Sequence, residues 1–113
     1  MTRMNRSEVE ATLERLRSQA RAENIRLTQH AQQAMVEEEI SLHDVLAAIE
    51  NGQILEDYPE HRRGPCCLLS GFTQAGRPIH VVAATALPTL VLITVYQPKP
   101  PRWVTPTKRK QGL

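Results

Sequence analysis

Apolar residues recur at intervals of three and four along the N-terminal half of the chain. This period places them on one side of a helix and predicts amphipathic helices over residues 7–22, 28–38 and 41–51. The predicted core positions of the three helices are Val9, Leu13, Leu16 and Ala20; Leu27, Ala31, Ala34 and Met35; and Leu42, Val45, Leu46 and Ile49.

The expected helix ends carry residues that satisfy free backbone groups. Ser7 and Glu10 have the spacing of a capping box at the start of the first helix. Thr28 and Ser41 offer hydroxyl caps to the second and third helices. Gly52 follows the third helix and would end it in a left-handed conformation.

The pattern changes to short, β-branched segments in the C-terminal half. The run 79–96 approaches the length of a membrane-spanning helix, but Pro88 would break that helix and the β-branched residues favour strands. Short links between neighbouring strands make them antiparallel. The four predicted strands span residues 53–58, 65–73, 77–85 and 89–97.

Helices followed by a meander of strands predict an α+β fold, with the N-terminal helices on one face of a four-stranded antiparallel sheet. We expect a single domain over residues 1–97, in which the helix at 7–22 is an N-terminal extension. Residues 98–113 are basic and proline-rich, and we expect this tail to be extended and partly disordered.

Strand alternation then predicts a polar group on the sheet face that the helices leave open. In the third strand the aliphatic set is Ile79, Val81 and Ala83, and in the fourth it is Val91, Ile93 and Val95. If these sets meet the helices, His80, Thr94 and Tyr96 share the open face. With a turn near residue 87, His80 would lie opposite Thr94, and Tyr96 would lie one diagonal step away.

Charge is divided unevenly along a chain whose net charge is +2. No acidic side chain follows Glu60, and no Lys or Arg lies between residues 27 and 61. Such a division creates a local positive field that attracts polyanions, although a solvated tail explains part of it. The basic side chains of the C-terminal half are Arg62, Arg63, Arg77, Lys99, Arg102, Lys108, Arg109 and Lys110.

Cofactor, metal and membrane functions receive no support from the sequence. The chain is too short for a separate cofactor domain, so no cofactor is expected. Cys66 and Cys67 are adjacent, which suits neither a mutual disulfide nor spaced zinc ligands, so we expect two buried thiols and no metal. No apolar N-terminal segment resembles a signal peptide, and we expect a cytoplasmic protein.

Several segments in this order resemble a known family. The segments are "HAQQAMVEEEISLHDVLAAIENGQILEDYP", "GRPIHVVAA" and "LITVYQP", followed by Trp103. Together they resemble the domain of unknown function 4258 family over roughly residues 26–103. The chain departs from this family at Ala34, where members often have arginine, and at Glu38-Glu39, where members often have Arg-Gly. Positions that match the family pattern are His30, Met35, Ile40, Gly52, Arg77, His80, Tyr96 and Trp103.

The resemblance implies a fold similar to RelE/ParE-like and BrnT-like toxins, which are small ribonucleases or gyrase poisons that an antitoxin neutralises. Of these activities we expect metal-independent cleavage of RNA, in which a base takes the 2′-hydroxyl proton and an acid protonates the leaving 5′-oxygen. His30, near the N-terminal end of a helix, is the candidate base, and His80 or Tyr96 is the candidate acid. The candidate nucleic-acid-binding residues are Arg62, Arg63, Arg77, Lys99, Arg102 and Trp103, with Trp103 stacking on a base.

Each candidate also has an ordinary structural interpretation. A histidine at a helix border is often a hydrogen-bonded packing residue, Tyr96 can simply pack its ring, and Trp103 can fix the chain end to the core. His43 and His61 have the pattern of surface residues. The alternative function is a non-catalytic module that binds protein or nucleic acid. Candidate partners are RNA, a cognate antitoxin and a second copy of the chain in a homodimer.

Overall fold

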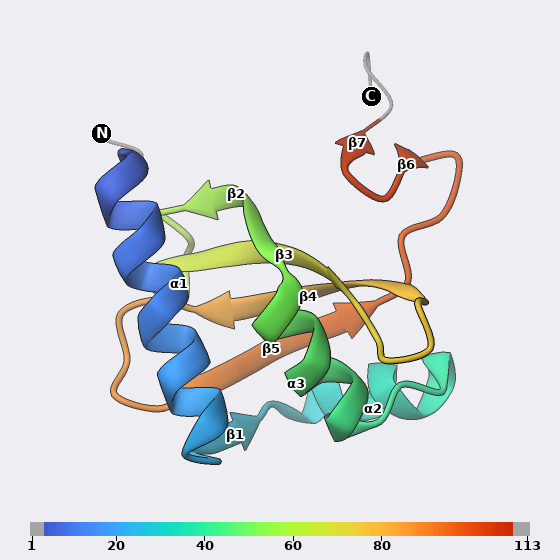
Figure 1. Ribbon diagram of the computed structural model, residues 1–113, viewed down its shortest axis with the longest axis horizontal. Coiled ribbons are helices and arrows are strands. Elements are labelled where there is room, and N and C mark those ends of the chain that lie inside the picture. The colour runs from blue at the N-terminus through green and yellow to red at the C-terminus, as the bar shows by residue number, and fades with distance from the viewer. Residues whose placement is uncertain (1–3, 110–113) are drawn as a thin grey trace.

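The computed structural model describes residues 4–109, and its three helices lie in the N-terminal half of the chain (Figure 1). They are α1 (Arg6–Arg21), α2 (Gln29–Glu38) and α3 (Leu42–Asn51). Each boundary lies within one residue of the predicted one, because the apolar period and the caps act locally. None of the helices within residues 4–109 is long and apolar enough to cross a membrane.

Two of the predicted caps are confirmed. The Thr28 side chain accepts from the Ala31 backbone N–H, and Ser41 forms a full capping box with Asp44. The capping box at Ser7 is wrong, because α1 begins one residue earlier and its cap is Asn5, whose side chain accepts from the Glu8 N–H.

The left-handed exit predicted at Gly52 is also wrong. Gly52 is extended (φ −88°), and a Cβ at this position would lie 2.4 Å from the Ala48 carbonyl oxygen and 2.7 Å from that of Ser70. Glycine is therefore required here because α3 closely approaches the neighbouring strand, and not because of its backbone angle.

The predicted meander is present, and it is part of a larger mixed sheet. Its strands are β2 (Gln53–Tyr58), β3 (Cys66–Phe72), β4 (Pro78–Ala84) and β5 (Leu90–Tyr96), each antiparallel to the next. A fifth strand, β1 (Ile25–Leu27), lies parallel to β5 and gives the order β1-β5-β4-β3-β2. The prediction of four purely antiparallel strands missed β1, because three residues are too few to show an alternation.

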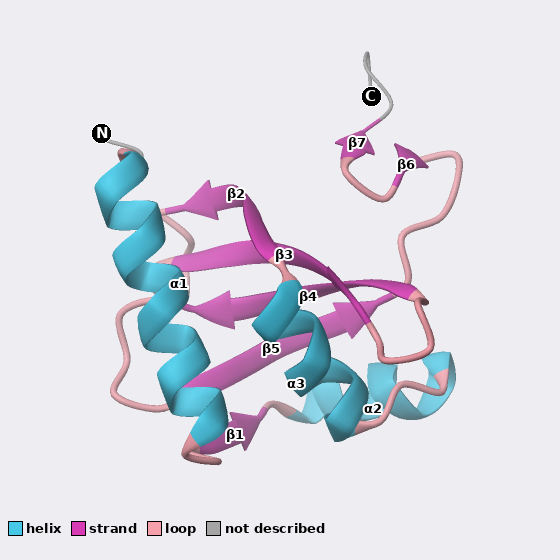
Figure 2. Cartoon of the chain, viewed as in Figure 1, coloured by secondary structure: helices cyan, strands magenta, loops and turns pink. Residues whose placement is uncertain are grey.

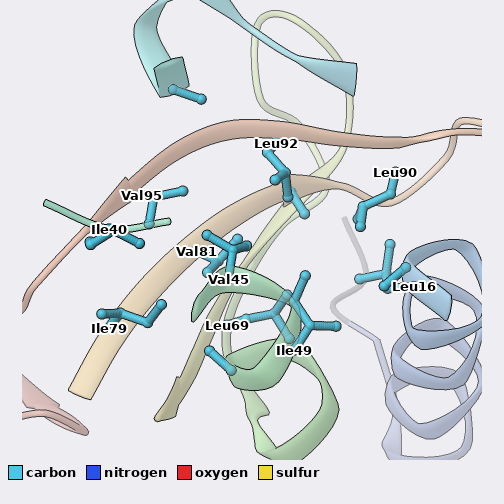
Figure 3. Close-up of a cluster of buried hydrophobic side chains, with 14 of the residues drawn as sticks. Leu16, Ile40, Val45, Ile49, Leu69, Ile79, Val81, Leu90, Leu92 and Val95 are labelled. Carbon is cyan, nitrogen blue, oxygen red and sulfur yellow. The ribbon is translucent and has the colours of Figure 1, made fainter. Parts of the chain in front are cut away.

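The helices and one face of the sheet enclose the main core, as predicted (Figure 3). Val45 and Ile49 of α3 and Leu16 of α1 meet side chains of the sheet such as Val81 and Leu92. All five are almost completely buried.

A β-bulge changes the expected alternation in β5. Val82 pairs with Thr94, but Ala83 pairs with Leu92, so Ile93 is an extra residue in β5. The core face of β5 therefore carries Leu90, Leu92 and Val95. The predicted set Val91, Ile93 and Val95 is correct only for Val95.

The second sheet face, which the sequence pattern leaves open, is covered in part by the C-terminal segment. Two short strands, β6 (Trp103–Thr105) and β7 (Lys108–Arg109), pair with each other beyond β5 (Figure 2). Trp103 is only 3% exposed and packs on His80 of this face. The expected extended tail is therefore wrong for residues 103–109, and the expectation for residues 110–113 lies outside the described residues.

Candidate functional site

His80 lies in a closed environment on the second sheet face. It is 0% exposed and pairs directly with Tyr96 across β4 and β5. The prediction that Thr94 lies opposite His80 is wrong: the observed register differs by two residues, one of which is the bulge at Ile93. The His80 ring lies edge-on to Trp103, with 4.4 Å between the ring centroids.

Both ring nitrogens of His80 are engaged. Nε2 lies 2.5 Å from the Pro106 carbonyl oxygen, which can only accept, so Nε2 carries the proton. Nδ1 is then free to accept from the Tyr96 hydroxyl at 3.2 Å. Burial lowers the pKa of His80 and raises that of Tyr96, so both side chains are held neutral.

A charged clamp fixes the C-terminal segment over this pair. Arg109 donates to both carboxylate oxygens of Glu56 on β2, at 2.6 and 2.8 Å, and its guanidinium lies 4.6 Å from the centre of the Trp103 ring. The Arg109 hydrogen bonds lower the pKa of Glu56. Burial, together with the hydrogen bond that Tyr58 donates to Glu56, raises the pKa of Tyr58 to about 12. A substrate therefore reaches His80 only if the segment moves away.

An open groove lies elsewhere, between α2 and the loop that joins β2 to β3. Its volume is about 810 Å³. Arginine and histidine side chains line it, and within residues 4–109 no carboxylate does. The residues of this α2–loop groove are Thr28, Gln29, His30, Gln33, His61, Arg62, Arg63 and Ile93.

The start of α2 is fixed against β5 at the bulge. The Thr28 hydroxyl donates to the Ile93 carbonyl oxygen at 2.8 Å and accepts from the Ala31 N–H at 3.0 Å, and the Thr28 N–H donates to Leu92. His30 consequently lies in the first turn of α2, where the backbone N–H groups have no acceptor within the helix. This positive end of the helix favours an anion beside His30.

The opposite wall of the groove is a loop held by its own backbone. The His61 N–H donates to the Tyr58 carbonyl, the Gly64 N–H donates to the His61 carbonyl, and the Pro65 carbonyl accepts from Thr85. Gly64 has a φ of +108°, a conformation that favours glycine. Within residues 4–109, neither Arg62 nor Arg63 forms a salt bridge, so both cations are available to a ligand.

The structure brings together only some of the residues that the sequence singled out. His30, Arg62 and Arg63 meet in the α2–loop groove, although the loop and the helix are far apart in sequence. His80 and Tyr96 do not line that groove and lie under the C-terminal segment. His61, which the sequence pattern placed among surface residues, also lines the groove. Its position directly before Arg62-Arg63 was the available signal.

Arg77 lies at the other end of α2. Its guanidinium donates to the Glu38 and Glu39 carbonyl oxygens at 2.5 and 3.0 Å and to the Gln97 side chain at 2.7 Å. It therefore caps the helix C-terminus, about 15 Å along the axis from the first turn.

The remaining cations expected to bind nucleic acid lie outside the groove. Lys99 and Arg102 are exposed in the segment between β5 and β6. The Trp103 ring is buried, so no face of the ring is free to stack on a base. Its indole nitrogen has no hydrogen-bond partner among the described residues.

The two cysteines are packing residues, and the described residues contain no metal site. Cys66 and Cys67 are free and buried, and burial raises the pKa of Cys67 to about 12, which keeps the thiol protonated and unreactive. Within residues 4–109 no three His, Cys, Asp or Glu side chains gather closely enough to hold a metal ion.

Comparison with known proteins agrees with the resemblance seen in the sequence. The model of the family described as domain of unknown function DUF4258 matches residues 27–97, which run from the last residue of β1 to just past the end of β5. The match contains both walls of the α2–loop groove and leaves out α1 and the C-terminal segment. Neither the curated proteins nor the solved structures gave a match. The match spans more than half of the chain, and the protein belongs to the DUF4258 family.

Proposed function

We propose that the protein binds single-stranded RNA in the α2–loop groove and cleaves it without a metal ion. The observation that carries the proposal is that His30, Arg62 and Arg63 line one open groove, none of whose described lining residues is a carboxylate. A phosphodiester needs cations around its anionic oxygens and a proton acceptor near the 2′-hydroxyl, and this groove contains both.

In the proposed reaction His30 acts first as a base. It takes the proton from the 2′-hydroxyl, whose oxygen attacks the adjacent phosphorus, and the 5′-oxygen of the next nucleotide leaves. Arg62 and Arg63 balance the charge that develops on the phosphate oxygens. The departing oxygen receives a proton from the imidazolium that His30 has become, or from water in the open groove. The products are a 2′,3′-cyclic phosphate and a free 5′-hydroxyl.

This assignment leaves His80 and Tyr96 out of proton transfer. Both contribute to the contacts that hold the C-terminal segment, and His80 has no exposed surface. Arg77 supports the proposed site indirectly, because it anchors the far end of the helix whose first turn carries His30.

The biological setting that we propose is a toxin–antitoxin system. In this setting the protein has a RelE-like fold, and a cognate antitoxin holds it inactive, alone or as a homodimer. An α+β domain with helices on one face of a meander supports this assignment. Expression without a partner should slow bacterial growth, and His30→Ala should restore it.

The direct test uses a fluorescent single-stranded RNA with purified wild-type protein, in excess EDTA. We expect cyclic phosphate ends, and we expect His30→Ala to abolish cleavage without changing the thermal midpoint, because the His30 side chain is exposed. His43→Ala is the matched control, since His43 is an exposed histidine near the start of α3. Cleavage that survives His30→Ala would refute the mechanism.

A second candidate function is a non-catalytic RNA-binding module. It is favoured by the burial of His80 and by the acidic residues at the far end of α2, where Glu38 accepts from the Gln97 N–H. Wild-type protein that binds RNA with a strong salt dependence but leaves it intact would select this function. Each phosphate contact should contribute about 0.7 to the slope of log affinity against log salt.

A further inference from the structure

We propose that His61 is a phosphate-binding residue that acts as a neutral N–H donor and does not transfer a proton. The ligand is a backbone phosphate of single-stranded RNA, so the inference rests on the proposed function for its ligand. It assigns a role to the second imidazole of the groove, and it limits proton transfer there to His30.

The backbone of the loop determines which nitrogen of His61 carries the proton. The Arg63 backbone N–H donates to His61 Nδ1 at 3.2 Å. A backbone N–H can only donate, so Nδ1 is an acceptor and the neutral ring carries its hydrogen on Nε2. In this tautomer the ring has no free lone pair with which to act as a base.

The same contact opposes a role as a proton donor. An imidazolium carries hydrogens on both nitrogens, and a hydrogen on Nδ1 would point at the hydrogen of the Arg63 N–H. The loop would have to break that bond before His61 could supply a proton to a leaving group. The bonds from His61 to Tyr58 and from Gly64 to His61 hold the loop in the observed conformation.

The remaining donor suits a phosphate. Nε2–H lies across the ring from the Nδ1 contact, in a residue that lines the groove together with Arg62 and Arg63. One neutral N–H and two guanidinium groups, from three consecutive residues of one groove wall, can donate to phosphate oxygens. The positive end of α2 faces this set from the other wall.

Two substitutions separate a neutral donor from a charged or proton-transferring group. His61→Gln keeps an N–H donor at a similar reach but cannot transfer a proton, whereas His61→Ala removes the donor. The probe is a fluorescent 2′-O-methyl RNA oligonucleotide, which lacks the attacking hydroxyl and cannot be cleaved. Binding is measured by anisotropy at pH 7.5 and low salt, with His43→Ala as the control.

We expect His61→Ala to weaken binding about tenfold, the effect of one hydrogen bond to a charged group, and His61→Gln to stay within about threefold of wild type. Equal binding by the alanine variant and the wild type would overturn the proposal. The proposal would also be overturned if His61→Gln bound as weakly as His61→Ala while His61→Lys bound tightly. That pattern would mean that the position requires a cation and not a neutral donor.

Cleavage of ordinary RNA supplies the second measurement. If His61 only binds phosphate, His61→Gln keeps most of the cleavage rate, whereas His30→Gln loses it. A glutamine variant that binds normally but does not cleave would overturn the proposal and make His61 the acid. If the wild-type protein binds the uncleavable RNA but does not cleave ordinary RNA, the ribonuclease proposal is refuted and the role of His61 in binding is not. If it does not bind RNA, both proposals are refuted.

Discussion

Replacing Trp103 by alanine tests how the C-terminal segment is held over His80. The indole is 97% buried, since its exposed fraction is 3%, and it contacts both His80 and Arg109. Burying a tryptophan removes about 150–250 Å² from water, which at about 25 cal/mol per Å² stabilises the docked segment by roughly 4–6 kcal/mol as an upper value. Measured Trp→Ala changes in cores cost about 3–5 kcal/mol.

The expected result is local opening of residues 98–109 and not global unfolding, because α1 to β5 retain their own core. A loss of about 3 kcal/mol raises the open population about a hundredfold. Trypsin cleavage between Lys108 and Arg109 should accelerate by the same factor, because cleavage needs a locally unfolded chain. Mass spectrometry identifies the bond that is cut, and rates are divided by those of the urea-unfolded chain.

Val104→Ala is the matched control, because Val104 is the next residue along the chain and is 59% exposed. Its cleavage rate should stay within about threefold of wild type, as expected for a surface substitution. A Trp103→Ala protein that is folded and cleaved no faster than the Val104→Ala protein would refute the idea that the indole holds the segment. It would also remove the reason for treating His80 as inaccessible.

Two further predictions concern the sheet. Burial lowers the pKa of His80 from its ordinary value of 6.5, so below that pH the unfolded chain binds a proton at His80 more readily than the folded chain does. The free energy of unfolding, measured with urea, should therefore be constant above about pH 6.5 and fall below it, at up to about 1.4 kcal/mol per pH unit. An NMR titration showing that the His80 ring ionises at or above pH 6.5 would contradict this. Gly71→Ala should destabilise the protein by about 1–3 kcal/mol or more in urea unfolding, because its Cβ would lie 2.1 Å from the Ala48 carbonyl oxygen. Gly76→Ala meets no atom within 4 Å and should cost only about 1 kcal/mol for its positive φ, so equal losses in the two variants would show that the close approach of α3 to β3 is unimportant.

Elements with local signals could be predicted from the amino-acid sequence. The apolar period and the hydroxyls of Thr28 and Ser41 placed α2 and α3 to within a residue, because a helix forms its backbone bonds within its own segment. The alternation and the short turns placed β2 to β5 in an antiparallel meander, because a short turn brings a strand back beside the strand that precedes it. Arg62 and Arg63 stood out as candidates through charge alone.

Pairings between distant segments of the chain could not be predicted in this way. Strand β1 depends on hydrogen bonds to β5, and the bulge at Ile93 depends on how β5 registers with β4, so neither is visible in a local pattern. That bulge shifts the register by one residue, and His80 lies opposite Tyr96 and not Thr94. Burial beneath the folded C-terminal segment then withdraws His80 from solvent, since a side chain is exposed or buried according to what packs on it.

For the candidate site, the sequence indicated the residue types and the structure showed which residues lie together. The residue types of His30, Arg62 and Arg63 predicted phosphate chemistry, but no spacing in the sequence could show that a helix start and a loop more than thirty residues later share one groove. Helix α3 and strand β2 lie between them in the chain. The packing of α3 on the sheet and the pairing of β2 with β3 determine where the loop lies. His61 lines the site because the fold brings its loop to the first turn of α2.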